Sequence, residues 1–272
     1  MRRGGSLHVR SARAQGEAVA RLAILPGYGD HSGRYAEFMR WLATHGVSSY
    51  ALDFRGHGKA AGRRGYVRQW ADFEDDVKVF LDHIARESGL KPPAFLLGHS
   101  HGALVAAELG VHNGLPALIE GLVLLSPFFR SQIEVPPLKL MAARVANVCL
   151  PWLRLGSGLE PEMMTSDHAM VEDSKKDGLL LRCATPRWYF GMLEAQADTM
   201  KRARTLELPL LCMIGSADSV ADPKAAGKFC ESVSSFESHF EVLQGQKHEL
   251  LRETKRLGTF VKICDWIKAR AK

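Results

Sequence analysis

The segment Ala94-Phe95-Leu96-Leu97-Gly98-His99-Ser100-His101-Gly102 decides the fold, because in it a serine stands between two glycines directly after an apolar run. Residues 94–97 predict a buried strand, and the apolar stretch 103–109 predicts a helix. A Gly-x-Ser-x-Gly sequence between a strand and a helix is typical of a nucleophile elbow. Such an elbow holds its serine in a strained turn, so the residues two positions away must be small. The segment therefore predicts that Ser100 is a nucleophile.

A metal site is the competing interpretation of this segment, because histidines flank Ser100 on both sides. A zinc site needs three or four ligands, and no nearby Cys, Asp or Glu completes a set with His99 and His101. We therefore expect both histidines to pack and orient the elbow.

Short apolar runs recur along the chain and alternate with helical periods. The runs that predict buried strands are residues 20–25, 49–54, 94–97, 121–125, 208–214 and 239–243. Apolar residues at helical spacing fall in 35–42, in 70–84 with Gly89 as a stop, and in 257–267. Strand alternating with helix predicts an α/β fold, with a mostly parallel central sheet and helices on both faces.

One region breaks this alternation. From about Pro127 to Leu206 the chain has no convincing strand and only helical pieces. One stripe at helical spacing consists of Leu138, Met141, Val145, Val148 and Trp152. We expect a helical cap at 127–206, of which one helix could simply cover the sheet, between core segments 1–126 and 207–272. The apolar cap faces favour a substrate with a greasy acyl chain.

Composition narrows the classes of partner. The 272 residues are 46% hydrophobic and 24% charged, enough for one large core with an insertion. The net charge of +6 is scattered in short basic runs without interleaved aromatic residues, so we expect no nucleic acid partner. Weak attraction to an anionic lipid surface fits this charge. The oligomeric state is left open.

Cysteine usage and hydropathy indicate the compartment. Five cysteines form no CxxC pair and lie mostly in apolar runs, which is typical of reduced thiols. The N-terminus lacks the apolar stretch of a signal peptide, and no uncharged apolar segment approaches the ~18 residues that cross a bilayer. We expect a cytoplasmic protein that can lie at the periphery of a membrane.

A nucleophilic serine needs a histidine base and a carboxylate, which in this architecture follow it in the order acid, then histidine. The apolar run 208–214 leads into Gly215-Ser216-Ala217-Asp218, so Asp218 lies just past a strand. Asp222 is the rival acid, but it stands beside Pro223, where an aspartate at a helix start needs no catalytic role. His248 follows the last strand and is the predicted base.

The tetrahedral intermediate of acyl transfer needs backbone N–H donors for its oxyanion. The first predicted donor is the amide after the nucleophile, that of His101. The second comes from the glycine-rich loop after residues 20–25, where Pro26 has no N–H to donate and Tyr28 is the predicted donor. A glycine-rich turn without such a role is the alternative for this loop.

Several segments together resemble the monoacylglycerol lipase and lysophospholipase family of α/β-hydrolases. Residues 26–35 resemble its His-Gly-x-Gly-Glu-His-Ser-x-Arg-Tyr opening, and 53–58 its Asp-x-Arg-Gly-His-Gly segment. The elbow 98–102, the acid turn 215–218 and the segment 248–253, His-Glu-Leu followed by a glutamate, are similar to that family as well. The matches run from about residue 22 to 253, and only the cap diverges.

Carried over position by position, the resemblance implies that Ser100 is the nucleophile, Asp218 the acid and His248 the base. It implies that the amides of Tyr28 and His101 form the oxyanion hole. The expected activity is hydrolysis of carboxylic esters of lipids, most simply of a monoacylglycerol or a lysophospholipid, without a metal or organic cofactor. The cap allows transient contact with a membrane surface.

The chain departs from the family pattern at two site positions. Pro26 replaces the usual His, and His101 stands where the family usually carries Met. A general carboxylesterase, an acyltransferase and an aminopeptidase remain alternatives because they use the same three residues. A binding module without activity would need a broken triad, and all three members are present.

Overall fold

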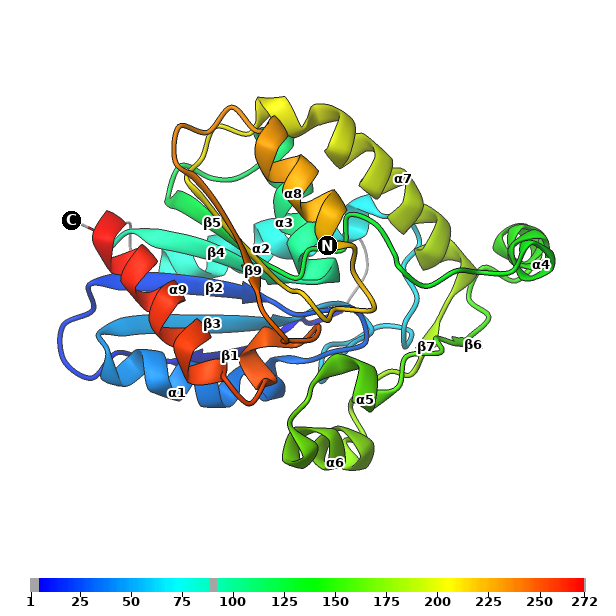
Figure 1. The fold of residues 1–272 in the computed structure, drawn as a ribbon, viewed down its shortest axis with the longest axis horizontal. Coiled ribbons are helices and arrows are strands. Elements are labelled where there is room, and N and C mark those ends of the chain that lie inside the picture. The colour runs from blue at the N-terminus through cyan, green and yellow to red at the C-terminus, as the bar shows by residue number, and fades with distance from the viewer. Residues whose placement is uncertain (1–4, 89–91, 272) are drawn as a thin grey trace.

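The central sheet has seven strands in the order β1-β3-β2-β4-β5-β8-β9 in the computed structural model, which describes residues 5–88 and 92–271 (Figure 1). The strands are β1 (His8–Ala12), β2 (Ala20–Leu25), β3 (Val47–Asp53), β4 (Ala94–His99), β5 (Ile119–Leu125), β8 (Leu210–Gly215) and β9 (Ser238–Leu243). Only β1 is antiparallel to its neighbour in this sheet; the other pairs are parallel. The predicted α/β fold with a mostly parallel sheet is confirmed.

Helices cover both faces of the sheet. On one face lie α1 (Ala36–Thr44) and α9 (Arg256–Arg270), and the 3₁₀ turn η1 (Ser32–Tyr35) precedes α1. The apolar stripes of α1 and α9 share a core cluster with alternate residues of β2, β4 and β5. On the other face lie α2 (Ala71–Ser88), α3 (His101–Val111), α7 (Pro186–Arg202) and α8 (Pro223–Ser232). Every residue of α3 is buried, as its nearly continuous apolar sequence requires, because α3 packs between the sheet and α7.

The chain between β5 and β8 adds no strand to the central sheet in the described residues. It forms α4 (Pro137–Cys149), α5 (Pro161–Met164), α6 (His168–Lys176), α7 and the 3₁₀ turn η2 (Ala203–Thr205). In Figure 1, α4 protrudes from the body while α5 and α6 lie below the edge of the sheet. Trp188, Met192 and Ala195 of α7 join the main core cluster, so this helix also covers the sheet.

Two details differ from the sequence predictions, and a third is not tested. Strand β1 was not predicted, because its residues are polar and only half-buried at the sheet edge. A two-stranded antiparallel ladder, β6 (Leu155–Gly156) and β7 (Cys183–Ala184), lies where no strand was expected, because two-residue strands carry no periodicity. The predicted helix stop at Gly89 lies outside the described residues.

The apolar stripe of α4 faces outward. Leu138, Met141, Val145 and Val148, here called the α4 stripe, are 61–80% exposed, and Trp152 lies beyond the end of the helix. These four side chains do not line the cavity described below, so the apolar character of this helix face has to be explained in another way. Among the described helices, none is both long and apolar enough to cross a membrane.

Candidate active site

The serine elbow joins β4 to α3. Ser100 has φ 53° and ψ −113°, a backbone conformation that non-glycine residues rarely adopt. A Cβ on Gly98 would lie 2.4 Å from the carbonyl oxygen of Gly102, and one on Gly102 would lie 2.2 Å from that of Leu25. Both positions therefore require glycine, for the steric reason that the sequence indicated.

Three side chains from distant parts of the chain meet at the carboxyl edge of the sheet. Nε2 of His248 lies 2.9 Å from Oγ of Ser100, and Nδ1 of His248 lies 2.8 Å from Oδ2 of Asp218. Asp218 follows β8 and His248 follows β9, so parallel strand ends bring both loops beside the elbow. All three residues are at least nine-tenths buried. The arrangement can pass a proton from the hydroxyl to the imidazole and hold the resulting charge.

The carboxylate of Asp218 is held in its charged form. Burial alone would raise the pKa of Asp218, but the charge of His248 and its hydrogen bond, with bonds from two backbone amides, lower it below its usual value. Those amides belong to Val220 and Ala221 and both donate to Oδ1. The rival Asp222 instead accepts the N–H of Lys224 as the N-cap of α8. The structure brings Asp218, and not Asp222, to the histidine.

The loop after β2 lies directly against the elbow, since a Cβ on Gly27 would lie 3.5 Å from that of Ser100. None of the described residues accepts a hydrogen bond from the backbone N–H of Tyr28 or of His101. The Tyr28 hydroxyl donates to the carbonyl of Gly65, and its ring stacks on Trp188 at 3.8 Å, which anchors the loop from its side chain. Two free amides next to Ser100 are what an oxyanion hole requires.

The two histidines of the elbow are buried against neighbouring side chains and backbone. His99 lies 3.2 Å from the hydroxyl of Tyr35 and 3.3 Å from the carbonyl of His248. His101 lies among aromatic rings, and burial lowers its pKa well below the usual value. In the described part of the chain, the one group close enough to share a metal ion is Glu74, Glu108 and His112, which includes neither histidine of the elbow.

A mostly apolar cavity of about 740 Å³ opens above Ser100. Its walls include the loop after β2, His248, and residues of the segment between β5 and β8 such as Met164, Leu181 and Met192. From α4 it is Lys139 and the three alanines at 142, 143 and 146 that line the cavity, not the α4 stripe. The volume suits a ligand of drug or lipid size.

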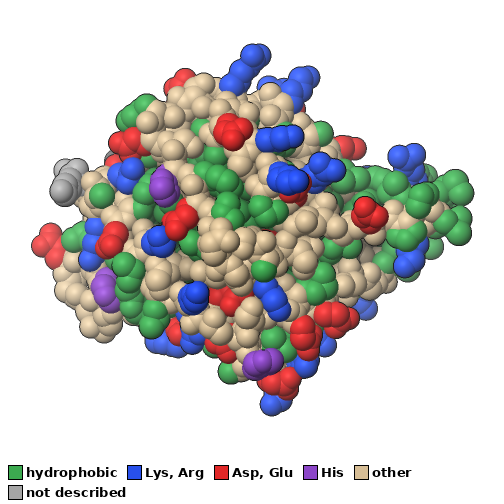
Figure 2. Space-filling model, viewed as in Figure 1, with side chains coloured by type: hydrophobic (Ala, Val, Ile, Leu, Met, Phe, Trp, Pro, Cys, Tyr) green, Lys and Arg blue, Asp and Glu red, His purple; other side chains and the backbone are tan. Residues whose placement is uncertain are grey.

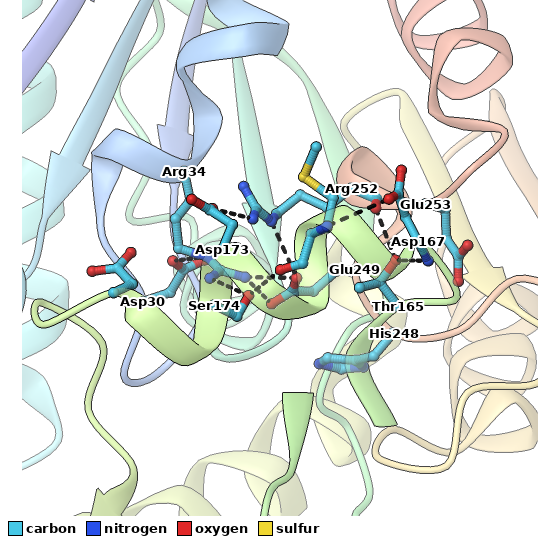
Figure 3. A network of polar contacts seen from close by, with 12 residues as sticks. Asp30, Arg34, Thr165, Asp167, Asp173, Ser174, His248, Glu249, Arg252 and Glu253 are labelled. Atoms are coloured by element: carbon cyan, nitrogen blue, oxygen red, sulfur yellow. Dashed lines mark hydrogen bonds and ion pairs between the residues drawn. The ribbon is translucent and has the colours of Figure 1, made fainter. Parts of the chain in front are cut away.

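Sequence reasoning missed a buried ionic network beside His248, drawn in Figure 3. The guanidinium of Arg34 lies 3.0 Å from Asp30 and 2.6 Å from Glu249, and it donates a hydrogen bond to Ser174 of α6. Burial would lower the pKa of Arg34, but Glu249 and Asp30 raise it above its usual value. Arg34 and Glu249 lie within the sequence motifs that resemble the family. Their place in those motifs is the signal that could have identified them from the sequence.

Comparison with known proteins gives consistent matches over nearly the whole chain. Residues 16–255 match the family described as serine aminopeptidase, S33. The chain is 31% identical over 243 residues to phospholipase YtpA of Bacillus subtilis, covering 89% of this chain and 92% of that protein. It is 30% identical over 273 residues to the monoglyceride lipase of Homo sapiens, covering 98% and 88% of the two chains.

Solved structures show the same architecture. The monoacylglycerol lipase of Paleococcus ferrophilus superposes with a TM-score of 0.85 at 24% identity, over 97% of this chain and 99% of that one. A soluble variant of monoglyceride lipase from Saccharomyces cerevisiae, in complex with a substrate analogue, superposes with a TM-score of 0.90 at 21% identity, over 99% and 94%. At these identities the likeness concerns the fold.

Proposed function

The chain belongs to the serine aminopeptidase S33 family of α/β-hydrolases and is a carboxylic ester hydrolase, and we propose that it hydrolyses monoacylglycerols or lysophospholipids through an acyl-enzyme on Ser100. This membership confirms the resemblance read from the sequence motifs. One observation carries the proposal: Ser100, His248 and Asp218 form a hydrogen-bonded row, and Ser100 and His248 of this row line a large apolar cavity.

The proposed reaction uses the three side chains in order. Nε2 of His248 takes the proton of the Ser100 hydroxyl as Oγ attacks the ester carbonyl, and Asp218 stabilises the imidazolium through Nδ1–H. The amides of Tyr28 and His101 donate to the oxyanion. The imidazolium then protonates the departing alcohol, and a water molecule attacks the acyl-enzyme by the same route to release the acid.

The cavity supports a substrate with one long apolar chain. Its mainly apolar wall can bury an acyl chain, each CH₂ contributing about 0.8 kcal/mol. Monoglyceride lipases and a phospholipase are among the relatives that cover most of this chain. A glycerol or glycerophosphate ester with a single acyl chain satisfies both observations.

We propose that residues 127–206 act as the cap and that the α4 stripe rests on a lipid surface. Figure 2 shows hydrophobic side chains gathered over the protruding α4, with Lys and Arg side chains beside them. Lys139 and Arg144 lie on the same helix, and the net charge is +6. Apolar side chains rimmed by cations suit the boundary of an anionic membrane. Substrate could then pass from the membrane into the cavity under α4.

The test is a panel of glycerol esters and lysophospholipids from acetyl to palmitoyl, run with wild type and Ser100→Ala. We expect activity to rise with chain length and to fall by about 10⁴-fold or more in the variant. A steady fall with chain length would leave only a general esterase. Faster transfer to glycerol than to water would indicate an acyltransferase, and preferred cleavage of N-terminal amides would indicate an aminopeptidase. A Ser100→Ala variant with most of its activity would refute the mechanism.

A further inference from the structure

A seam of hydrogen bonds joins the catalytic histidine loop to one part of the cap (Figure 3). The backbone N–H of Glu249, next to His248, donates to the carbonyl of Met164 at 2.7 Å. The hydroxyl of Thr165 donates to the carbonyl of Arg252 at 2.8 Å. Cap residues 164–165 therefore lie along the loop that carries the base.

Glu253 closes this seam with a single buried carboxylate. Its Oε1 accepts the N–H of Lys247 at 2.9 Å and the N–H of Ser166 at 3.1 Å, and its Oε2 accepts the N–H of Thr254 at 3.1 Å. Lys247 immediately precedes His248, whereas Ser166 belongs to the cap. One oxygen atom thus bridges the base loop and the cap.

This carboxylate has no counter-charge in the described part of the chain. Glu253 is 1% exposed, and among the described residues no Lys, Arg or His forms an ion pair with its side chain. A buried carboxylate is tolerated when hydrogen bonds satisfy it. Its three partners are all backbone amides, so the charge serves to fix backbone segments rather than to bind another side chain.

The same part of the cap also touches the other active-site loop. The N–H of Leu181 donates to the carbonyl of Gly29, in the loop after β2, at 2.8 Å. Arg64, in the loop after β3, donates to the carbonyl of Leu179 and holds the same segment from a third side. In the residues that the structure describes, α4 makes no hydrogen bond to either active-site loop. The cap thus has a braced arm, residues 161–182, and a separate projecting helix.

We propose that Glu253 is a positioning residue that locks the His248 loop onto the braced arm of the cap, and that this arm is part of the catalytic frame rather than a moving lid. The inference rests on the proposed role of His248. Met164 lines the cavity, and its carbonyl accepts a hydrogen bond from the N–H of Glu249, the residue next to His248. A substrate that contacts this arm is therefore linked to the position of the base through one hydrogen bond.

The experiment compares Glu253→Ala, Glu253→Gln and Thr165→Val in the full chain. Turnover of 4-nitrophenyl butyrate is divided by the number of sites that a fluorophosphonate titrates, and thermal unfolding is recorded in parallel. The glutamine keeps one oxygen for the amides of Lys247 and Ser166, whereas the alanine removes all three acceptor contacts. We expect kcat per titrated site to fall about 10- to 100-fold in Glu253→Ala with KM nearly unchanged, because small misplacements of a catalytic group cost this much. Glu253→Gln should keep most of the wild-type kcat per titrated site. Thr165→Val should lower kcat per titrated site, as Glu253→Ala does.

The matched control is Glu241→Ala, which removes a carboxylate of β9 that is paired with Lys262 of α9 and takes no part in the seam. It should leave kcat per titrated site unchanged. If Glu253→Ala lowers the unfolding temperature but keeps wild-type turnover per site, the residue is only structural and the inference is overturned. If Glu253→Ala does not fold, equal turnover in Thr165→Val and wild type overturns it. Failure of the proposed function is distinguishable from this outcome, because it would appear as activity that survives in Ser100→Ala.

Discussion

Replacing Asp218 with Asn should abolish turnover without disturbing the fold. Oδ1 of Asp218 faces two N–H donors, those of Val220 and Ala221, at 2.8 and 2.9 Å. The amide oxygen of the asparagine must take that place, because an NH₂ group there would face two donors. The NH₂ group then points at Nδ1 of His248, which now lies 2.8 Å from Oδ2.

This geometry fixes the wrong tautomer of His248. With an N–H donor opposite Nδ1, the imidazole must carry its proton on Nε2, the atom 2.9 Å from the hydroxyl of Ser100. A protonated Nε2 cannot accept the serine proton. Loss of the correct tautomer and of the carboxylate charge costs about 10⁴ in kcat, or about 5 kcal/mol in activation free energy.

The assay is kcat for a soluble 4-nitrophenyl ester, with thermal unfolding as the check on folding. Asp222→Asn is the matched control, because it makes the same change four residues later at the N-cap of α8, where Asn caps as well as Asp. We expect the control to keep wild-type activity. If Asp218→Asn stays within about tenfold of wild type while Asp222→Asn is inactive, the assignment of the acid is refuted.

Three further predictions address the cap and a buried carboxyl. Changing the α4 stripe to serine should abolish binding to phosphatidylglycerol vesicles and leave hydrolysis of soluble esters intact, whereas the same change at the exposed Leu257 and Val261 of α9 should not alter vesicle binding. Ala146→Phe should reduce kcat/KM for palmitoyl esters by about tenfold relative to butyryl esters, since Ala146 lines the cavity; an unchanged ratio would contradict this. Burial, with the neighbouring carboxylates, raises the pKa of Glu108 from 4.5 to about 7 although Trp70 donates to it. Its contribution to stability is therefore full below pH 4.5 and lost as pH rises through 7. Glu108→Gln should unfold at a higher temperature than wild type at pH 8 and match it at pH 4, with Glu120→Gln, on an exposed side chain, as the control variant.

The central strands were predictable because their environment is uniform. A strand covered on both faces must be apolar throughout, and this explains why 20–25 was predicted with the bounds of β2. The edge strand β1 has no such requirement, since one side of it faces solvent and its partner β3 supplies the pairing. Burial on both faces leaves a pattern in the sequence, whereas pairing through the backbone alone does not.

The residues to which we assign a reactive role were also predictable from the sequence, whereas the residue that we propose positions them was not. Ser100, Asp218 and His248 each follow a strand at a position that the architecture dictates. The partners of Glu253 are backbone amides, so no side-chain pattern in segments 164–166 or 247–254 encodes the contact. A seam made by one carboxylate and several N–H groups is a property of tertiary structure.

Helix α4 is an exception to the rule that the apolar face of an amphipathic helix is buried. Periodicity identifies an apolar stripe, and over a packed core the stripe faces inward. A helix that roofs a cavity must leave that cavity open, so the side chains facing it have to be small. In α4 they are Ala142, Ala143 and Ala146, together with Lys139, whereas the large apolar side chains of the α4 stripe are exposed and do not line the cavity. Four adjacent apolar side chains exposed to water are costly, and the contact with lipid that we propose for the α4 stripe would offset that cost at the point where substrate would enter.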